Sequence, residues 1–181
     1  LPDDEPTIRA ALDAASQDHD VILTSGGVSV GEEDHIKPAV EALGSLHFWR
    51  LAVKPGRPVA LGQVGKVPFV GLPGNPAAAI VTFLRFARPM ILLLAGDART
   101  DPVIVQVRSA FSHSKKAGRR EWVRASVTVN NDGLAEAHKF PREGAGVLSS
   151  ICGSDGLVEL PEDMTELQPG SLVNFISFNE V

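Results

Sequence analysis

The stretch DVILTSGGVSVGEED, residues 20–34, joins a short apolar run to a glycine-rich segment. The apolar residues 21–23 predict a buried strand, and the segment TSGG, residues 24–27, then takes the place of an ordinary turn. A glycine pair lets backbone N–H groups approach an anion without interference from a Cβ atom, and the neighbouring hydroxyls add donors. We therefore expect an anion-binding loop that begins at Ser25, Gly26 and Gly27.

The same loop has a second interpretation that the sequence leaves open. A tight connection from a strand to a helix also needs glycine for backbone freedom, and Ser29 and Gly31 fit either interpretation. The loop has neither the lysine of a P-loop nor the spacing of G-x-G-x-x-G. The two common nucleotide-binding motifs therefore do not apply.

Acidic residues flank this loop. Asp34 either caps the helix that follows or acts as a carboxylate ligand of Mg²⁺ beside a bound phosphate, because this cation prefers oxygen ligands. Asp3 and Asp4 either join that site or start the first helix.

Secondary-structure patterns divide the chain into two parts. Up to residue 98, strands and helices alternate, which predicts a layered α/β domain. From residue 99 the pattern is of repeated short strands separated by turn residues, which predicts a small all-β, barrel-like domain. The predicted helices are residues 7–16, 36–43 and 76–94, and the predicted strands are 21–24, 45–53, 59–62, 67–71, 103–111, 120–129, 134–138, 156–160 and 171–178.

Composition excludes several classes of protein. With 181 residues, of which 44% are hydrophobic, the chain is long enough for one medium or two small domains. Arg85, Arg88 and Pro89 interrupt its longest apolar region, so we expect no transmembrane helix and no membrane partner. The net charge of −5 argues against broad nucleic-acid binding. A single cysteine, Cys152, excludes an internal disulfide and fits a reducing compartment.

Three cations surround a proline-glycine turn. Alternation along residues 45–54 places Arg50 and Lys54 on the same face of one strand, and Arg57 follows in the turn KPGRP, residues 54–58. Exposed cations are common on strand edges, which is the structural alternative. Ligands of α/β sheets gather at strand ends, so two fixed charges here would also suit a small oxyanion.

A second basic stretch is SKKAGRREWVR, residues 114–124. It is either a solvated hairpin tip or a clamp on an anion held by the neighbouring domain. The five histidines and Cys152 have no spacing typical of zinc ligands, so we predict no zinc site.

Three motifs in this order suggest a family. TSGGVSVG (residues 24–31), KPGRP (54–58) and GLPGNP (71–76) resemble those of the molybdopterin molybdenumtransferases, MoeA in bacteria and the E domain of gephyrin in animals. The resemblance extends over nearly the whole chain. The first and last motifs are shared with the molybdopterin adenylyltransferases of the MogA type, and the segment GRREW, residues 118–122, favours the first family.

The resemblance implies a fold and a reaction. Residues 1–98 would form a three-layer α/β/α MogA-like domain that is incomplete at its N-terminus, and residues 99–181 a C-terminal β-barrel domain. Such proteins insert molybdate into adenylylated molybdopterin and release AMP in an Mg²⁺-dependent reaction. Asp34, Asp3 and Lys54 match catalytic positions, and Asp34 and Asp3 match the Mg²⁺ ligands. The positions that match substrate-binding residues are Ser25, Gly26, Gly27, Ser29, Arg50, Arg57, Pro73, Gly74, Asn75, Pro76, Arg119 and Ser149, with Ser150 as an alternative to Ser149.

The resemblance also implies a context. We expect a cytoplasmic protein that forms a homodimer, binds pterin phosphate and molybdate, and does not bind nucleic acid. The chain begins without Met and without the family's N-terminal region, so we expect it to be part of a longer protein and inactive alone. Two alternatives stay open, namely a MogA-type adenylyltransferase and a gephyrin-like scaffold that binds proteins.

Overall fold

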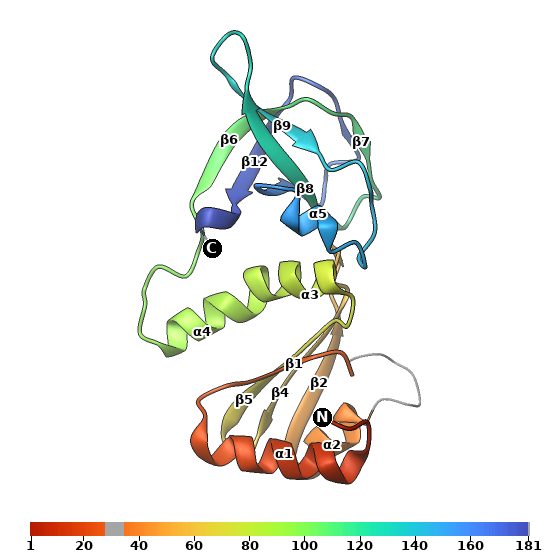
Figure 1. Ribbon diagram of the computed structural model, residues 1–181, viewed down its shortest axis with the longest axis vertical. Coiled ribbons are helices and arrows are strands. Elements are labelled where there is room, and N and C mark those ends of the chain that lie inside the picture. Colours follow the sequence, from red (N-terminus) through yellow and green to blue (C-terminus); the bar gives the residue numbers. More distant parts are fainter. Residues whose placement is uncertain (28–34, 181) are drawn as a thin grey trace. The chain divides into compact units, whose positions relative to one another are not determined.

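The chain forms two compact units in the computed structural model, which describes residues 1–27 and 35–180, with the backbone alone at Phe48 and Trp49. The first, which we call the α/β unit, consists of Leu1–Leu51 and Gly56–Thr100, and the second, the β unit, of Ala52–Pro55 and Asp101–Val181 (Figure 1). The sequence predicts a boundary between residues 98 and 99. It gives no sign that Ala52–Pro55 belongs to the second unit.

The α/β unit is built on a four-stranded sheet in the order β1-β5-β4-β2. β1 and β5 are parallel neighbours, whereas β4 is antiparallel to both β5 and β2. The elements of this unit are α1 (Glu5–Asp18), β1 (Ile22–Ser25), α2 (Ile36–Leu43), β2 (Gly44–Arg50), β4 (Pro58–Val64), β5 (Val67–Leu72), α3 (Pro76–Thr82), the π-helical turn η1 (Phe83–Ala87) and α4 (Arg88–Leu94).

Helices cover both faces of this sheet. On one face, Ile8 and Leu12 of α1 and Val40 of α2 pack in one buried cluster with strand residues that include Phe69. On the other face, Val70 and Leu72 of β5 pack with Ala87, Phe83 and Met90 of the long helix. Neighbouring residues of β5 therefore face opposite helical layers, as strand geometry requires. The predicted three-layer α/β/α arrangement is confirmed.

The long helix runs without a break from Pro76 to Leu94. Proline has no N–H, and its ring would clash with the carbonyl four residues earlier. The helix passes Pro89 through the π turn η1, in which the Arg88 N–H bonds to the Phe83 carbonyl. The arginines and the proline do not shorten it: by length and composition alone it is long and apolar enough to cross a membrane, a test that core helices of soluble proteins also pass.

The β unit is a closed sheet. Its strand order is β10-β12-β6-β9-β8-β3, and an additional pairing of β10 with β8 joins the first strand to the fifth. The ring of β10, β12, β6, β9 and β8 is therefore closed, and β3 adds to it beside the start of β8. The elements are β3 (Val53–Lys54), β6 (Ile104–Ser109), β7 (His113–Ser114), β8 (Arg120–Val129), β9 (Ala135–Lys139), α5 (Ser149–Cys152), β10 (Gly156–Leu160), β11 (Glu166–Leu167), β12 (Leu172–Ser177) and the 3₁₀ turn η2 (Phe178–Glu180).

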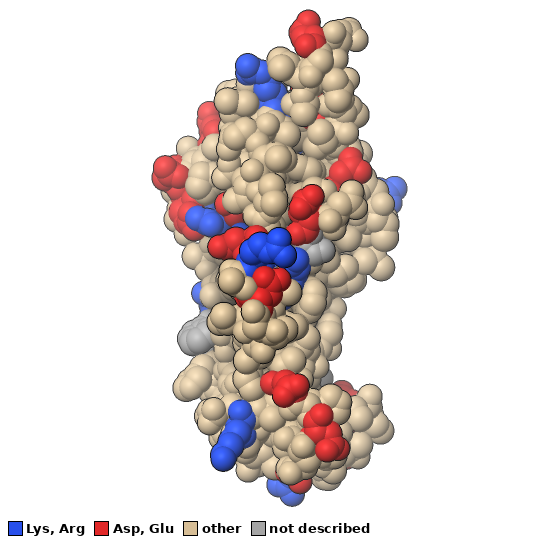
Figure 2. All heavy atoms as spheres, turned by 90° about the vertical axis from the view of Figure 1, so that its left-hand side faces the viewer, with Lys and Arg blue, Asp and Glu red and all other residues tan. Residues whose placement is uncertain are grey.

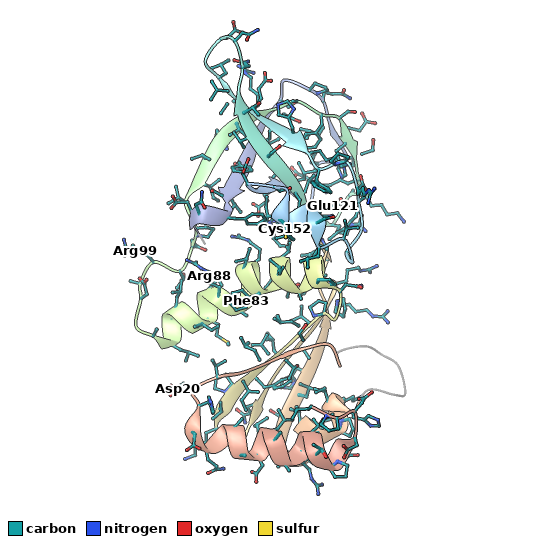
Figure 3. All side chains as sticks on the ribbon, in the orientation of Figure 1. Asp20, Phe83, Arg88, Arg99, Glu121 and Cys152 are labelled. Atoms are coloured by element: carbon teal, nitrogen blue, oxygen red, sulfur yellow. The ribbon has the colours of Figure 1, made fainter. Side chains whose placement is uncertain are left out.

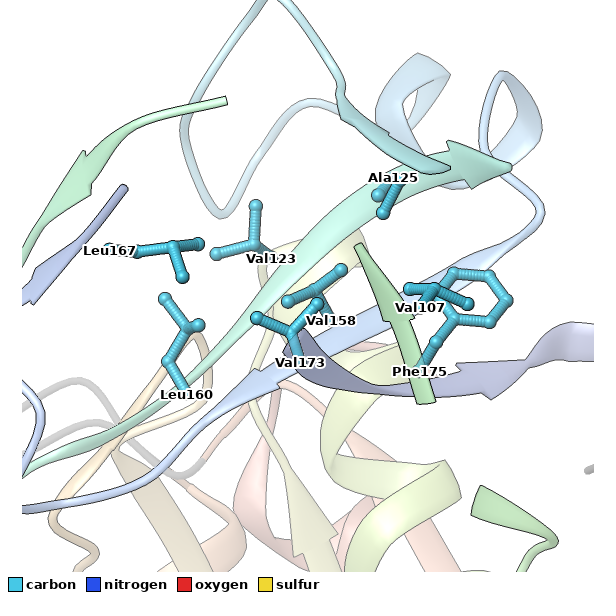
Figure 4. Packing of buried hydrophobic residues seen from close by; sticks show 9 residues of the cluster. Val107, Val123, Ala125, Val158, Leu160, Leu167, Val173 and Phe175 are labelled. Carbon is cyan, nitrogen blue, oxygen red and sulfur yellow. The ribbon is translucent and has the colours of Figure 1, made fainter. Parts of the chain in front are cut away.

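The interior of this barrel is filled by aliphatic side chains and one aromatic ring (Figure 4). The predicted barrel-like domain is thus confirmed. The turn at residues 131–133 joins β8 to β9, with Gly133 at φ 79°. The side chains in this core are Val107, Val123, Ala125, Ala137, Val158, Leu160, Leu167, Val173 and Phe175.

The single strand predicted for residues 45–53 is wrong. β2 ends at Arg50, and the Leu51 N–H then bonds to the Arg57 carbonyl at 2.9 Å, which closes a loop within the α/β unit. The chain passes into the other sheet at the tip of this loop, where β3 pairs with β8 in parallel. Arg50 and Lys54 therefore do not share a strand face.

Gly56 provides a test of this loop. It adopts φ 97°, and a Cβ at this position would collide with the Thr82 hydroxyl of α3. We expect Gly56→Ala to lower the free energy of unfolding by about 3 kcal/mol, because a strained backbone and a steric clash add. Urea denaturation measures this loss.

Gly96 is the matched control. It has φ 83° and nothing within 4 Å of an added Cβ, so Gly96→Ala should cost only the backbone strain of about 1 kcal/mol. Thr82→Ala should recover part of the loss in the Gly56→Ala background. Equal losses for the two glycine variants would contradict this account of the loop.

Candidate functional site

Residues distant in the sequence meet at one end of the α/β sheet. The strand register pairs Ser25 with Leu72 where β1 and β5 end, and Arg50 with Pro58 where β2 ends and β4 begins. β4 and β5 are neighbours, so these positions lie along one end of the same sheet. Most of the predicted substrate-binding residues of this unit therefore share one location.

The first and last motifs are in direct contact there. The Gly26 N–H bonds to the Leu72 carbonyl at 3.0 Å, and the Ser25 hydroxyl lies 3.4 Å from the Pro73 carbonyl. A Cβ at Gly74 would lie 3.5 Å from the Gly26 Cα. Gly26 and Gly27 have φ values of 89° and 67°, which L side chains rarely adopt. The glycines therefore allow both the turn and the close approach of the two loops.

We call the described site residues at this end of the α/β sheet the sheet-end group. Most of its side chains are exposed, whereas Pro73 is buried and the two glycines of the first loop are half-buried. Asn75 is the N-cap residue of α3, but its side chain makes no capping hydrogen bond. The group consists of Ser25, Gly26, Gly27, Arg50, Arg57, Pro73, Gly74, Asn75 and Pro76.

The predicted acidic residues are only partly described. Ser29 and Asp34 lie outside the described residues, and α2 begins after His35. Asp3 is exposed, and the next residue, Asp4, caps α1 by accepting the Thr7 N–H at 3.0 Å. Among residues 1–27 and 35–180, no three or more His, Cys, Asp or Glu side chains are grouped so that they could hold a metal ion.

The β unit contains a cluster of charged side chains centred on Glu121, which is 2% exposed and labelled in Figure 3. Its Oε1 accepts hydrogen bonds from Nε (3.0 Å) and Nη2 of Arg119. Its Oε2 lies 3.1 Å from His113 Nε2 and 3.3 Å from Lys54 Nζ. Two predicted site residues, Lys54 and Arg119, are therefore held by one buried carboxylate.

Two further residues complete this cluster. Lys139 Nζ lies 3.1 Å from His113 Nδ1 and also pairs with Glu143, which is 3.9 Å from Lys54 Nζ. An ammonium group can only donate, so His113 Nδ1 accepts and its Nε2 carries the proton that is donated to Glu121. We call Lys54, His113, Arg119, Glu121, Lys139 and Glu143 the Glu121 cluster.

The basic stretch 114–124 is not a solvated hairpin tip. Its second half enters the closed sheet as β8, in which Glu121, Trp122 and Arg124 are buried. Arg120 pairs with Glu159 and Glu162, which neutralise its charge. Arg124 donates to the buried Ser150 hydroxyl at 3.0 Å, and burial lowers the pKa of this guanidinium. Ser150 is thus the companion of Arg124 and not of Arg119.

Ser149, the other residue considered beside Arg119, is exposed and begins α5. Sequence reasoning also missed Glu121, His113, Lys139 and Glu143. The only local signal was that Glu121 is the single acid in a basic stretch. The other three residues have no spacing that relates them to Glu121, because they come from β7, from β9 and from the loop after β9 and meet Glu121 only in the folded unit.

Charged residues elsewhere are intermixed. Figure 2 shows acidic and basic side chains side by side on the face that it displays. The absence of nucleic-acid binding, expected from the net charge of −5, stays a prediction.

The Glu121 cluster predicts a pH dependence of stability. Burial alone would raise the pKa of Glu121, but hydrogen bonds from His113 and Arg119 and the charge of Lys54 outweigh it and hold the pKa below the ordinary 4.5. A lowered pKa stabilises the fold above the unfolded value, and this contribution is lost as pH falls through the folded pKa. We expect wild type to exceed Glu121→Gln in free energy of unfolding by about 2 kcal/mol above pH 4.5.

Urea denaturation of both proteins over a series of pH values measures this difference. It should shrink steadily below pH 4.5. A difference that is independent of pH would show that the Glu121 charge does not contribute.

Comparisons with known proteins agree with the motifs. Residues 1–92 match the family described as probable molybdopterin binding domain, and residues 106–178 match the MoeA C-terminal region (domain IV). A molybdopterin molybdenumtransferase from Haemophilus influenzae is 34% identical over 182 residues, covering 100% of this chain and 45% of the relative. One from Nostoc is also 34% identical, over 92% of this chain and 40% of the relative.

The fold agrees as well. A crystal structure of a molybdopterin biosynthesis MoeA protein from Pyrococcus horikoshii has a TM-score of 0.75 at 26% identity, covering 97% of this chain and 41% of that chain. The chain thus spans less than half the length of these relatives. Because the first family match covers about half of the chain, the chain belongs to the probable molybdopterin binding domain family, with a MoeA C-terminal region after this domain.

Proposed function

We propose that this chain acts in molybdenum cofactor biosynthesis, in the step that inserts molybdate into adenylylated molybdopterin and releases AMP. The observation that carries the proposal is the meeting of the first and last motifs at the sheet end, through the Gly26 N–H and the Leu72 carbonyl. The relatives named molybdopterin molybdenumtransferase support it. The match to the MoeA C-terminal region favours it over the MogA-type adenylyltransferase.

The sheet-end group suits the phosphate side of the substrate. The Gly26 N–H is bonded to the Leu72 carbonyl, whereas Gly27 brings its backbone to the loop without a Cβ atom. The exposed Ser25 can turn its hydroxyl from the Pro73 carbonyl, 3.4 Å away, to a phosphate. Backbone N–H groups and hydroxyls are the donors that phosphates accept from. Arg50 and Arg57 add exposed positive charge at the same end of the sheet.

The Glu121 cluster suits the oxyanion. Lys54 and Arg119 are partly exposed, at 44% and 24% of the side chain, while both are bonded to a buried carboxylate. Fixed cations in a partly desolvated place attract a small dianion such as molybdate more strongly than mobile surface cations do.

Mg²⁺ is a further part of the proposal. The ion would offset the negative charge of phosphate when the phosphoanhydride is cleaved. Of its two predicted ligands the structure describes Asp3, whose exposed carboxylate is compatible with this role, whereas Asp34 lies outside the described residues. We assign no step to the ion. A homodimer and a cytoplasmic location belong to the same proposal.

Substitution of the two cations that flank the KPGRP turn tests the proposal. We expect Lys54→Ala and Arg57→Ala, made in the natural protein, each to lower molybdate-dependent AMP release by about a hundredfold, because each removes a charged donor. The assay uses adenylylated molybdopterin, molybdate and Mg²⁺. Lys116→Ala, which removes an exposed cation of the β unit, is the control and should leave the rate unchanged.

Retention of full activity by both variants would show that the site is assigned wrongly. Adenylylation of molybdopterin by ATP would instead support the adenylyltransferase alternative. If the protein binds neither pterin nor molybdate but retains a protein partner in a pull-down, that result would support the scaffold alternative.

A further inference from the structure

Both oxygens of the Glu121 carboxylate are in contact with donor side chains of the β unit. A carboxylate accepts about four hydrogen bonds. Arg119 donates two hydrogen bonds to Oε1 through Nε and Nη2, His113 donates one to Oε2, and the Lys54 ammonium forms an ion pair with Oε2 at 3.3 Å. Glu121 is therefore neither a metal ligand nor a general base in this arrangement, since either role requires an available oxygen.

Stability alone does not account for this carboxylate. Burying charges is costly, and a buried ion pair is often no more stabilising than apolar residues of the same volume. The closed barrel already has an aliphatic core that includes Val123 and Leu160, near Glu121 in the strand register. We therefore look for a role of the Glu121 carboxylate other than packing in the barrel core.

Lys54 and Arg119 contact both the buried Glu121 carboxylate and the solvent. Lys54 and Arg119 each touch the buried carboxylate and yet keep part of the side chain exposed, at 44% and 24%. Their contacts with Glu121 use some of the N–H donors of an ammonium and a guanidinium group and leave others. Glu143 lies 3.9 Å from Lys54 Nζ, which is beyond hydrogen-bond distance, so the remaining N–H donors of Lys54 and Arg119 can turn to a second anion.

The backbone beneath these side chains is fixed as well. β3 is only two residues long, and its parallel register places Lys54 directly beside Glu121. The Arg120 N–H bonds to the Ala52 carbonyl at 2.9 Å. On the opposite side, Lys139 fixes the proton position of His113, so that His113 donates to Glu121. Both the position of Lys54 and the direction of the donors are thereby determined.

We propose that Glu121 is a positioning residue, which directs the remaining donors of Lys54 and Arg119 toward a bound oxyanion without touching that anion. The inference rests on the proposed function, in which these two cations bind molybdate. It adds Glu121, which lies two residues after Arg119 in the segment GRREW and was not among the predicted site residues. It also explains why a site for an anion contains a buried acid.

A simple charge effect predicts the opposite sign. If Glu121 only reduced the local positive charge, its replacement by a neutral residue would strengthen anion binding. If Glu121 positions the cations, the same replacement weakens binding, because Lys54 and Arg119 lose their fixed directions. The direction of the change therefore separates the two explanations.

Calorimetric titration of the full chain with sodium molybdate tests the sign. Glu121→Gln should weaken binding about tenfold or more, the effect typical of losing charged hydrogen bonds. Glu121→Asp keeps the charge but withdraws the carboxylate by one methylene, so it should weaken binding too. Glu162→Gln removes an acid that pairs with Arg120 outside the cluster, and it should change the affinity by less than about twofold.

A double-mutant cycle tests the route of the effect. In an Arg119→Ala background, Glu121→Gln should cause a clearly smaller further loss of molybdate affinity than in wild type, because one of the two cations that Glu121 positions is already absent. Fully additive losses, or tighter binding by Glu121→Gln, would overturn the inference. A thermal unfolding curve for each variant confirms that the compared proteins are folded at the titration temperature.

A measurement without ligand separates this inference from the proposed function. In ¹⁵N NMR spectra, the Arg119 Nε–H should be protected from solvent exchange in wild type and in Glu162→Gln, and unprotected in Glu121→Gln. Equal protection in all three proteins would overturn the positioning role, whether or not molybdate binds. Absence of molybdate binding by wild type, with the expected loss of protection in Glu121→Gln, would overturn the proposed function and support the positioning of Arg119.

Discussion

The ion pair of Lys54 with Glu121 fixes the place where the chain changes sheets. The chain leaves the α/β unit after Leu51, adds two residues to the barrel as β3, and returns at Gly56. A strand of two residues gains little stability from its own backbone hydrogen bonds. The ion pair of Lys54 with the buried Glu121 carboxylate therefore helps to hold β3 against β8. The same contact brings Lys54 of the KPGRP turn into a cluster with Arg119, which lies 65 residues later in the sequence.

Much of the fold follows from local pattern. The exact bounds of α2, β8 and β10 were predictable because each lies between clear start and stop residues, such as Gly44 after α2. The loop contacts at the sheet end were predictable in kind, since the glycine and proline motifs follow parallel neighbouring strands. The positive φ values of Gly26 and Gly27 agree with both functions considered for that loop, a tight turn and an approach to an anion.

The rest depends on contacts that no local pattern encodes. Alternation continued from Trp49 through Lys54, so the sequence could not show that the Leu51 N–H would close a loop on Arg57 and divide the strand. The Glu121 cluster joins strands β3, β7, β8 and β9 with Arg119 and Glu143 from adjoining loops, and β8 pairs with both β3 and β9. Likewise, Arg124 and Ser150 pair across 26 positions that include the whole of β9. Side-chain partners across a closed sheet require the strand order, which the sequence pattern does not supply.

The central claim is that a buried carboxylate holds cations for an oxyanion. Its most direct test is a titration of the ¹⁵N-labelled chain with molybdate, followed through the arginine Nε–H resonances. The account predicts that the Arg119 resonance moves and saturates while that of Arg108, an exposed arginine bonded to the Gly170 carbonyl, stays in place. An unchanged Arg119 resonance, or equal movement of both, would contradict the account.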